Sequence, residues 1–434
     1  GVVGLVNQGN AQAAKFNNVD SFFEGENYGT ALGSIIQLAS NTVLETDITY
    51  KKANLTYEEP NYENSSGVKT LENNTTYTRW SLAFSPRLRM DFNKFGNLVA
   101  GYDFSHSYGR DSGLSNAALV DNSVYAIYRL PIINNLDFDA GYRHQIENQT
   151  ANDKPSNHNP TGRKTTDADA WDAALNYKFS QQEKVYIKYN QSFRLPNIDD
   201  FWGYADPGNG NYTRVFRGAL LVPQIDRTYQ AGGDFLVGKT KITASIYHTD
   251  TSDQIRFESF NGYNINDPYS IERKGLSLST ISPISNRLTV YTNSNLQEVF
   301  YANGPNKGQS VPLAPHLTVN ARLNYEFDEN WSLGTVINYV GSQYYNNAQD
   351  LYNNKGDPTD RYSVAYKISD LFNKIPSYTV TDIYANYKAD KWDARITVKN
   401  VTNSHYATYG GVGFVTHPGG GGDWSYYYYP SDPR

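Results

Sequence analysis

Apolar and polar positions alternate with a two-residue period along most of the chain. The clearest segment is 317–327, whose apolar positions are Leu317, Val319, Ala321, Leu323, Tyr325 and Phe327. It has about the length that a tilted strand needs to cross a membrane. Similar alternation recurs at 98–105, 171–179, 184–189 and 382–399. Because helical periodicity is hard to find, the pattern predicts an all-β fold.

The links between the predicted strands alternate between short and long. The short links lie at 93–96, 131–135, 180–183, 237–240, 282–286, 328–330 and 388–391. The long links are polar and rich in Gly, Asn and Tyr, and they lie at 57–76, 109–121, 148–168, 195–225, 252–271, 297–315, 342–377 and from 402 onward. Short turns at one end and long loops at the other are typical of an up-and-down outer-membrane β-barrel.

Strands that arrive at the short links end in aromatic residues, as at 126–130, 176–179, 324–327 and 385–388. Aromatic residues at one depth predict a girdle at a membrane interface, whereas a soluble β-sandwich gives no reason for so regular an alternation of links. Counting back from the last hairpin gives about 16 strands. We therefore predict a partial transmembrane antiparallel barrel over 28–434, preceded by a loop or barrel-entry segment over 1–27.

Composition removes several function classes. The chain has 37 Tyr and 19 Phe but no Cys, which excludes disulfide frameworks and thiolate metal sites and suits an envelope compartment. A net charge of −6 argues against nucleic acid as a main partner. No run of about 18 apolar residues could cross a bilayer as a helix. A barrel strand, however, needs only alternate residues to be apolar.

Four sequence motifs in the second half occur in the order found in one family. They are QSFRLPN at 191–197 with LVPQ at 221–224, RKGL at 273–276, VPLAPH at 311–316, and a C-terminal set. The C-terminal set comprises TDIY at 381–384, VKNVTNSHY at 398–406 and YYPSDPR at 428–434. Together they resemble the barrel of TonB-dependent outer-membrane receptors. Ser277 stands where that family commonly has Glu. Residues 1–190 have a similar general pattern but no distinct motif of the family.

The resemblance implies a monomeric 22-stranded barrel filled by an N-terminal plug, surrounded by outer-membrane lipid and lipopolysaccharide. Such a receptor binds a scarce nutrient, most often a ferric siderophore or similar metal chelate, at extracellular loops. The TonB–ExbB–ExbD complex then drives import through the plug. We expect this chain to lack the plug, the initial strands and the last strand of that barrel. The long links would then be extracellular and the short ones periplasmic.

The predicted ligand-binding groups are aromatic and cationic residues of the long loops. Aromatic faces and guanidinium groups suit an anionic, partly aromatic ligand, through cation–π stacking and charge-assisted hydrogen bonds. The alternative for each residue is a self-packed surface loop in which Arg pairs with Asp. The candidates are Trp202, Tyr204, Tyr212, Arg214, Arg217, Tyr344, Tyr345, Tyr409 and Trp424.

A second set of residues lies on the polar side of the alternating strands. Lys188, Arg322, Glu326 and Arg395 are expected to face the lumen and, on the family resemblance, to contact the plug. The sequence offers no catalytic constellation, metal-ligand cluster or cofactor motif, so we expect neither an enzyme nor a metal or cofactor site. The alternative functions are a passive sixteen-stranded porin for small solutes and, in another class, an outer-membrane enzyme or adhesion barrel.

Overall fold

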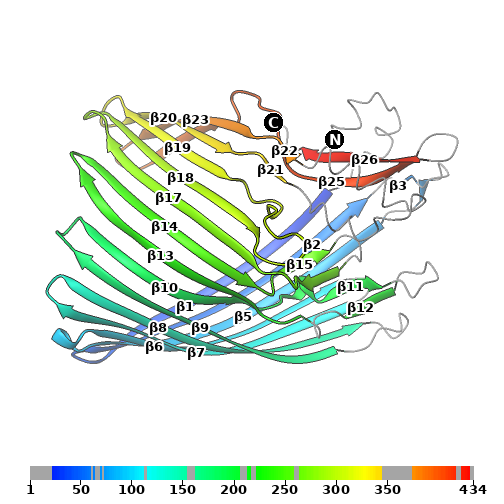
Figure 1. Cartoon of the computed structure of the whole chain (residues 1–434), viewed down its shortest axis with the longest axis horizontal. Helices are drawn as coiled ribbons and strands as arrows, with labels where there is room; N and C mark the ends of the chain where they lie inside the picture. Colours follow the sequence, from blue (N-terminus) through cyan, green and yellow to red (C-terminus); the bar gives the residue numbers. More distant parts are fainter. Residues whose placement is uncertain are drawn as a thin grey trace.

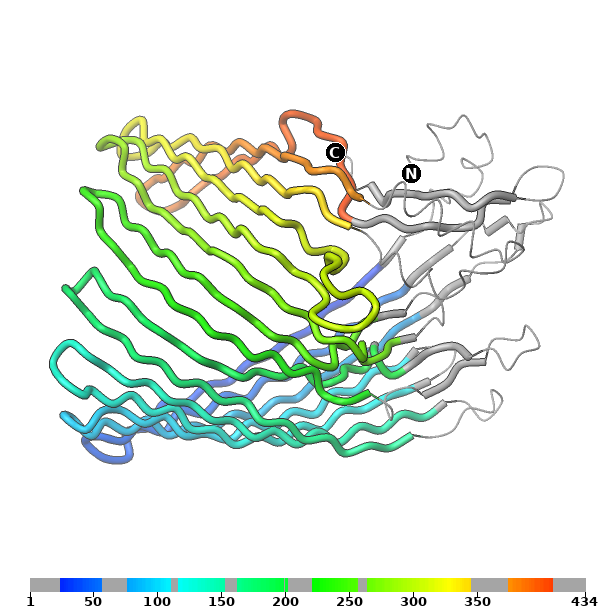
Figure 2. The backbone as a smooth tube through the Cα atoms, viewed as in Figure 1, coloured from blue at the N-terminus to red at the C-terminus, as the bar shows by residue number. Residues whose placement is uncertain are grey.

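The computed structural model describes residues 22–59, 62–63, 69–70, 73–111, 115–153, 162–205, 213–216, 221–258, 263–344, 374–416 and 422–430. Sixteen antiparallel strands form one sheet, each paired with its neighbours in chain order. The sheet curves into a barrel wall with tilted strands (Figures 1 and 2). Within the described residues, no helix is long and apolar enough to cross a membrane. The prediction of an all-β up-and-down barrel is confirmed.

The strands of the first half of the wall are long. They are β1 (Phe22–Ala39), β2 (Thr42–Glu59), β5 (Asn73–Asp91), β6 (Asn97–Asp111), β7 (Ser115–Ile133), β8 (Leu136–Asp153), β9 (Gly162–Lys178) and β10 (Lys184–Arg194). Those of the second half are mostly shorter: β13 (Gln224–Val237), β14 (Thr240–Ser252), β17 (Ile271–Pro283), β18 (Leu288–Tyr301), β19 (Leu317–Glu326), β20 (Trp331–Val340), β23 (Tyr378–Lys388) and β24 (Asp393–Val398).

Short strands lie outside this sheet, at the end opposite the short turns (Figure 1). β11 (Trp202–Ala205), β12 (Thr213–Phe216), β15 (Ile255–Glu258) and β16 (Tyr263–Asn266) form a four-stranded sheet. Three further pairs are β3 (Tyr62–Glu63) with β4 (Lys69–Thr70), β21 (Gln343–Tyr344) with β22 (Lys374–Ile375), and β25 (Ala407–Thr416) with β26 (Gly422–Pro430).

Two levels of aromatic side chains bound an aliphatic band on the outward face. Near the short turns, Tyr325 and Phe327 meet with ring centroids 4.9 Å apart. At the other level, Tyr189 contacts both Trp171 at 4.7 Å and Tyr229 at 4.6 Å. Between the two levels lie exposed aliphatic residues such as Ile187. This arrangement matches the girdles and lipid-facing band of an outer-membrane barrel.

Above the second aromatic level the outward face becomes polar. Tyr142 donates to Asp169 at 2.7 Å, and His144 lies 2.9 Å from the same carboxylate. The lipid-facing band therefore ends near Tyr142 and Trp171, although β8 and β9 continue beyond it. The first half of the wall thus projects past the membrane on the long-loop side.

The seven predicted short turns are present, and one more was missed, at residues 40–41 between β1 and β2. The turn at 93–96, between β5 and β6, is tight. It contains the 3-10 helix η1 (Asn93–Phe95) and ends at Gly96, which has a φ of 96°. A Cβ at Gly96 would lie 1.9 Å from the carbonyl oxygen of Arg129, so only glycine fits there.

Several predicted boundaries were wrong on the long-loop side. β1 begins at Phe22, within the segment 1–27 that was expected to be a loop or barrel-entry segment. The expected link 109–121 is mostly strand, since β6 ends at Asp111 and β7 begins at Ser115. The C-terminal tail, expected to be a loop, forms the β25–β26 hairpin. Above the membrane both faces of a strand meet polar surroundings, so the alternation that marks a strand disappears while backbone pairing continues.

Candidate functional site at the barrel mouth

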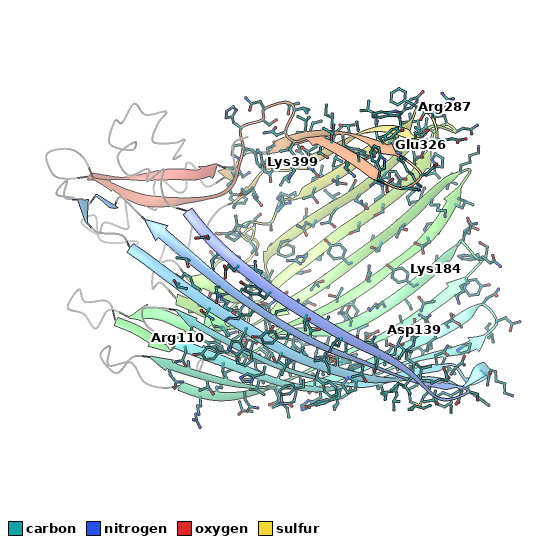
Figure 3. The ribbon with its side chains drawn as sticks, turned by 180° about the vertical axis from the view of Figure 1, so that it is seen from behind. Arg110, Asp139, Lys184, Arg287, Glu326 and Lys399 are labelled. Carbon is teal, nitrogen blue, oxygen red and sulfur yellow. The ribbon has the colours of Figure 1, made fainter. Side chains whose placement is uncertain are left out.

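The lumenal face of the first half of the wall carries a series of ion pairs. On β5, Arg87 lies 2.6 Å from Glu45 of β2. Further pairs are Arg143–Asp103 at 2.6 Å, Arg129–Asp139 at 2.7 Å, Lys178–Asp137 at 2.5 Å and Lys184–Asp234 at 3.2 Å. Figure 3 shows Asp139, Lys184 and Glu326 toward the short-turn end and Arg110 toward the long-loop end. The polar positions of the alternating strands therefore line the inside.

At the mouth, the segment after β10 is anchored to the inner wall by Phe201. Its side chain is fully buried against Ala117, Leu119 and Ala151 of β7 and β8. The preceding turn, η3 (Ile198–Asp200), is held by Asp200, whose carboxylate accepts from Arg194 at 2.8 Å and from the backbone N–H of Asn197 at 2.9 Å. The start of this loop is therefore folded onto the wall instead of projecting into solvent.

The loop between β14 and β17 is joined to the first one. Arg194 donates to the carbonyl of Ile255 at 2.9 Å. The Asn266 side-chain amide accepts from the backbone N–H of Val222 at 2.7 Å and donates to the Val222 carbonyl at 2.9 Å. Asp267 is 1% exposed and accepts from Arg256 at 2.7 Å. Because β11 also pairs with β16 at Gly203 and Tyr263, the two loops form one cap over the mouth.

A third loop, after β18, packs on the outer end of the wall. Tyr301 is 1% exposed and clusters with Ile271, Val299 and Val311. The backbone N–H of Leu313 donates to the Tyr344 carbonyl at 2.7 Å, which ties this loop to the segment after β20. The Lys374 ammonium lies 4.8 Å from the centroid of the Tyr344 ring. Aromatic and cationic groups therefore meet at this side of the mouth as well.

Next to the Phe201 anchor lies a buried polar patch. Asp121, Glu147 and Thr166 are direct cross-strand partners on β7, β8 and β9, and Gln149 follows Glu147 on the same face. Glu147 is 4% exposed and accepts from the Gln149 amide at 2.6 Å. This part of β8 lies beyond the lipid-facing band. Burial, reinforced by the charge of Asp121, raises the pKa of Glu147 to about 8.

A family model described as TonB dependent receptor-like, beta-barrel matches residues 4–401. The chain belongs to the TonB-dependent receptor family. It is a family of transport receptors, and their barrels lie in the bacterial outer membrane. A comparison with curated protein sequences gives no match.

Solved receptors share the fold at low sequence identity. The siderophore receptor PiuA from Acinetobacter baumannii has a TM-score of 0.70 and 15% identity, over 95% of this chain and 64% of PiuA. The ferric yersiniabactin uptake receptor FyuA from Yersinia pestis has a TM-score of 0.68 and 12% identity, over 93% and 60%. The ferric-catecholate import receptor Fiu from E. coli K12 has a TM-score of 0.67 and 16% identity, over 95% of this chain and 63% of Fiu. The chain thus spans less than two thirds of each receptor.

In this TonB-dependent receptor barrel, the predicted ligand-binding residues fall into three groups. Trp202, Tyr204 and Arg214 belong to the cap sheet, where Tyr204 and Arg214 stand opposite each other in register. Tyr344 lies beside Lys374, and Tyr409 and Trp424 belong to the β25–β26 hairpin. Tyr212, Arg217 and Tyr345 lie outside the described residues. The structure therefore brings three of the candidates into one small sheet, and their binding role stays a prediction.

The four residues predicted to face the lumen lie on the polar side of their alternating strands. Arg322 stacks on Tyr291 of β18 with 4.1 Å from guanidinium to ring centroid, and Arg395 stacks on Tyr384 of β23 at 4.0 Å. Lys188 lies 4.0 Å from Asp172 of β9. Glu326 lies at the end of β19, beside the turn. Contact of these residues with a plug stays a prediction.

Sequence reasoning missed Phe201 and the patch around Glu147. Phe201 was overlooked because it lies among the aromatic residues of a loop, where nothing local separates an anchor from an exposed ring. Glu147, Gln149 and Thr166 lie in or beside the segment interpreted as the link 148–168. Extending the period-two pattern of β8 from Gly141 through Arg143 and Gln145 would have placed Glu147 on the lumenal side.

Proposed function

We propose that this chain is the barrel of an outer-membrane uptake receptor for a scarce nutrient, with a ferric siderophore or similar metal chelate as ligand. The ligand binds at the cap formed by the loops after β10 and β14. Its import is driven by the TonB–ExbB–ExbD complex, acting through a plug that fills the lumen. The barrel occupies residues 28–434, extended on the N-terminal side to Phe22 by β1.

The joined loops at the mouth carry this proposal. A ligand that must be held before transport needs a binding surface with a defined shape, and the hydrogen bonds of Arg194 and Asn266 give the two loops one. The register pair Tyr204–Arg214 brings an aromatic and a cationic residue type side by side in that surface. Phenolate- and carboxylate-bearing metal chelates are anionic, so they match this chemistry. The solved receptors similar to this chain include receptors for ferric chelates.

The lumenal wall supports the proposal that import is driven through a plug inside the barrel. Arg322 and Arg395 each lie over a tyrosine ring, and neither forms an ion pair within the described residues, although Arg395 Nε donates to Thr397 at 3.3 Å. Such groups suit a polar partner inside the lumen, which is where the plug of this family lies. A passive porin offers no such partner, and its solutes would need no cap.

The decisive experiment measures uptake of ⁵⁵Fe-loaded catecholate, citrate and phenolate chelates by cells that express the full-length receptor. We expect saturable uptake of one chelate class, which stops when a protonophore collapses the proton motive force or when TonB is deleted. Uptake that is proportional to concentration and insensitive to the protonophore would instead identify a passive pore.

Binding is tested separately with the purified receptor. Arg214→Gln and Tyr204→Ala should each weaken binding of the transported chelate by about tenfold, as loss of one charge-assisted or stacking contact of about 1.4 kcal/mol would do. Arg110→Gln is the matched control, since Arg110 is an exposed arginine at the outer end of β6 and belongs to no strand of the cap sheet. Unchanged affinity in both cap variants would remove β11 and β12 from the binding site.

A further inference from the structure

The buried patch on β7, β8 and β9 is defined by its register. Asp121, Glu147 and Thr166 occupy one row across three adjacent strands, and directly paired residues have Cβ atoms about 4.5–5.5 Å apart. Gln149 lies in the next row on the same face, nearer the mouth, and Ser123 lies in the next row toward the membrane. Five oxygen-bearing side chains therefore converge on one small area of the inner wall.

The anchored loop closes off most of the patch from solvent, and Asp121 at its edge is half-buried. Glu147, Gln149 and Thr166 are 4%, 1% and 6% exposed. Phe201 packs on Leu119 and Ala151, which flank Gln149 on the same inner face. Lys164, the cross-strand partner of Gln149, donates to the Leu221 carbonyl at the other end of the loop. Both ends of the loop after β10 thus close the side of the patch that faces the mouth.

The patch contains oxygen atoms without a partner. Thr166 Oγ1, Gln149 Oε1 and Ser123 Oγ make no hydrogen bond, and only one other buried side-chain atom in the described part of the chain, on Asn306, shares that state. Leaving a buried polar atom unpaired costs about 1–3 kcal/mol. Three such atoms beside two carboxylates indicate that a bound ligand, which is not part of the protein chain, satisfies them.

The chemistry of the donors selects that group. The side chains of the patch offer oxygen donors: two carboxylates, hydroxyls, and the amide carbonyl of Gln149, whose Nε2 donates to Glu147. Hard divalent cations, and Ca²⁺ above all, bind such sets with six to eight ligands at about 2.3–2.6 Å. In their ionised forms Asp121 and Glu147 together match the two charges of the ion. The Asp121 carboxylate also accepts from Ser105 at 2.8 Å and from Gln145 at 3.0 Å. No group of three or more His, Cys, Asp or Glu side chains in the described residues is arranged to hold a metal ion by itself, so the neutral oxygens have to complete the coordination shell.

We propose that Asp121, Glu147, Gln149 and Thr166 form a Ca²⁺-class cation site, which fastens the outer end of the β7–β9 wall beneath the Phe201 loop. The charged groups nearby are Lys164, which is engaged with Leu221, and Arg143, which is paired with Asp103 and reaches Asp121 through Gln145. With only two carboxylates the affinity belongs to the weak extracellular class, with Kd on the order of 10⁻⁴–10⁻³ M. Cation binding does not depend on the proposed transport function.

The experiment titrates CaCl₂, with MgCl₂ as a comparison, into the purified full-length receptor in detergent, followed by isothermal calorimetry and by thermal unfolding. We expect saturable Ca²⁺ binding and a rise in the unfolding temperature, with a smaller response to Mg²⁺ because its octahedral shell tolerates such a set less well. Glu147→Gln should weaken Ca²⁺ binding by at least tenfold, and Thr166→Val by severalfold.

The matched control is Asp167→Asn, which removes an exposed carboxylate from the next residue on the opposite face of β9. It should leave Ca²⁺ binding unchanged. Folding of each variant is checked by circular dichroism, and Thr166→Val provides the test if Glu147→Gln fails to fold. The absence of Ca²⁺ binding at millimolar concentrations, or wild-type binding in both site variants, would overturn the proposal. Stability that responds to pH but not to Ca²⁺ would also overturn it, and would assign the carboxyl pair to a shared proton.

Discussion

Two stretches of the same barrel wall treat their inward-facing cations differently. On β7–β9 three basic residues are paired with carboxylates: Arg129 with Asp139, Arg143 with Asp103 and Lys178 with Asp137. From β18 to β24, Arg322 and Arg395 lie on tyrosine rings, and neither makes an ion pair within the part of the chain that the structure describes. A guanidinium over a ring keeps most of its N–H donors, whereas one paired with a carboxylate has used them.

The difference assigns the two stretches different tasks. In the first, several basic residues are paired with carboxylates, the strands are longer than the membrane requires, and the outer end is covered by the Phe201 loop. Its polar residues hold strands and cap together. The second is shorter, and its arginines are the ones that we propose to meet a partner inside the barrel. The contrast can be tested by changing one residue at a time.

The largest effect is expected from Phe201→Ala, which removes the cover of the first stretch. Truncating a fully buried Phe to Ala costs about 3–5 kcal/mol, and here the loss falls on docking of the loop because Phe201 lies between loop and wall. Hydrogen exchange of the amides at 197–201 should accelerate while the β7–β8 amides below the mouth stay protected. Phe179→Ala, at an exposed ring beside a short turn, is the control and should leave that exchange unaltered.

Leu323→Arg tests the outward face, which the two stretches have in common. Leu323 lies on the lipid-facing side of β19, so an arginine near the midplane should destabilise the folded barrel by about 2–4 kcal/mol. Asn324→Arg, one residue along and facing the lumen, should cost much less. Urea unfolding in lipid vesicles measures both, and equal stability of the two variants would contradict the assigned strand parity.

The pair Arg143→Gln and Arg322→Gln addresses the comparison directly. Arg143 is about one-third exposed in its pair with Asp103, so its replacement should cost about 1 kcal/mol of folding stability. Loss of the Arg322–Tyr291 contact should cost about 0.5–1 kcal/mol. Chelate uptake should fall more in the Arg322 variant, since its donors are the ones available to a lumenal partner. Uptake that falls only in the Arg143 variant would reverse the assignment.

The smallest effect concerns the turn after β19. Asp328 accepts from the backbone N–H groups of Trp331 at 2.7 Å and Asn330 at 2.9 Å, and these bonds hold its pKa below the ordinary value of 3.8. Because the pKa of the folded state is lowered, the stabilisation is present above about pH 4 and is lost as the pH falls through the folded value. Hydrogen exchange at Trp331 should show this loss in the wild type but not in Asp328→Asn.

Much of the barrel followed from local patterns. The alternation at 317–327 predicts both the strand and the side of it that meets lipid, because neighbouring side chains of a strand point to opposite faces. Short turns such as 93–96 are recognisable because turn chemistry is local. The candidate site was predicted less well. Tyr204 and Arg214 were identified by type, but only pairing of β11 with β12 places them opposite each other.

Other features had no local signal. The strand extension at 109–121 depends on pairing of β6 with β7 after the lipid contrast has ended. Phe201 became an anchor because Ala117, Leu119 and Ala151 offer an apolar surface on the inner wall. Glu147 became buried because a loop from fifty residues later in the chain packs beside it. These contacts join residues that are distant in the sequence.

The sequence by itself determined the fold class, the orientation of the strands and the membrane the barrel occupies, because lipid on one side and water on the other impose a period of two on every crossing. Only the tertiary structure decided how far the wall rises above the membrane, which loops fold into a cap, and where oxygen atoms gather without partners. Above the lipid both faces of a strand meet polar surroundings, so the sequence there carries no alternating pattern. Pairing and packing between distant segments therefore determine the structure of that region.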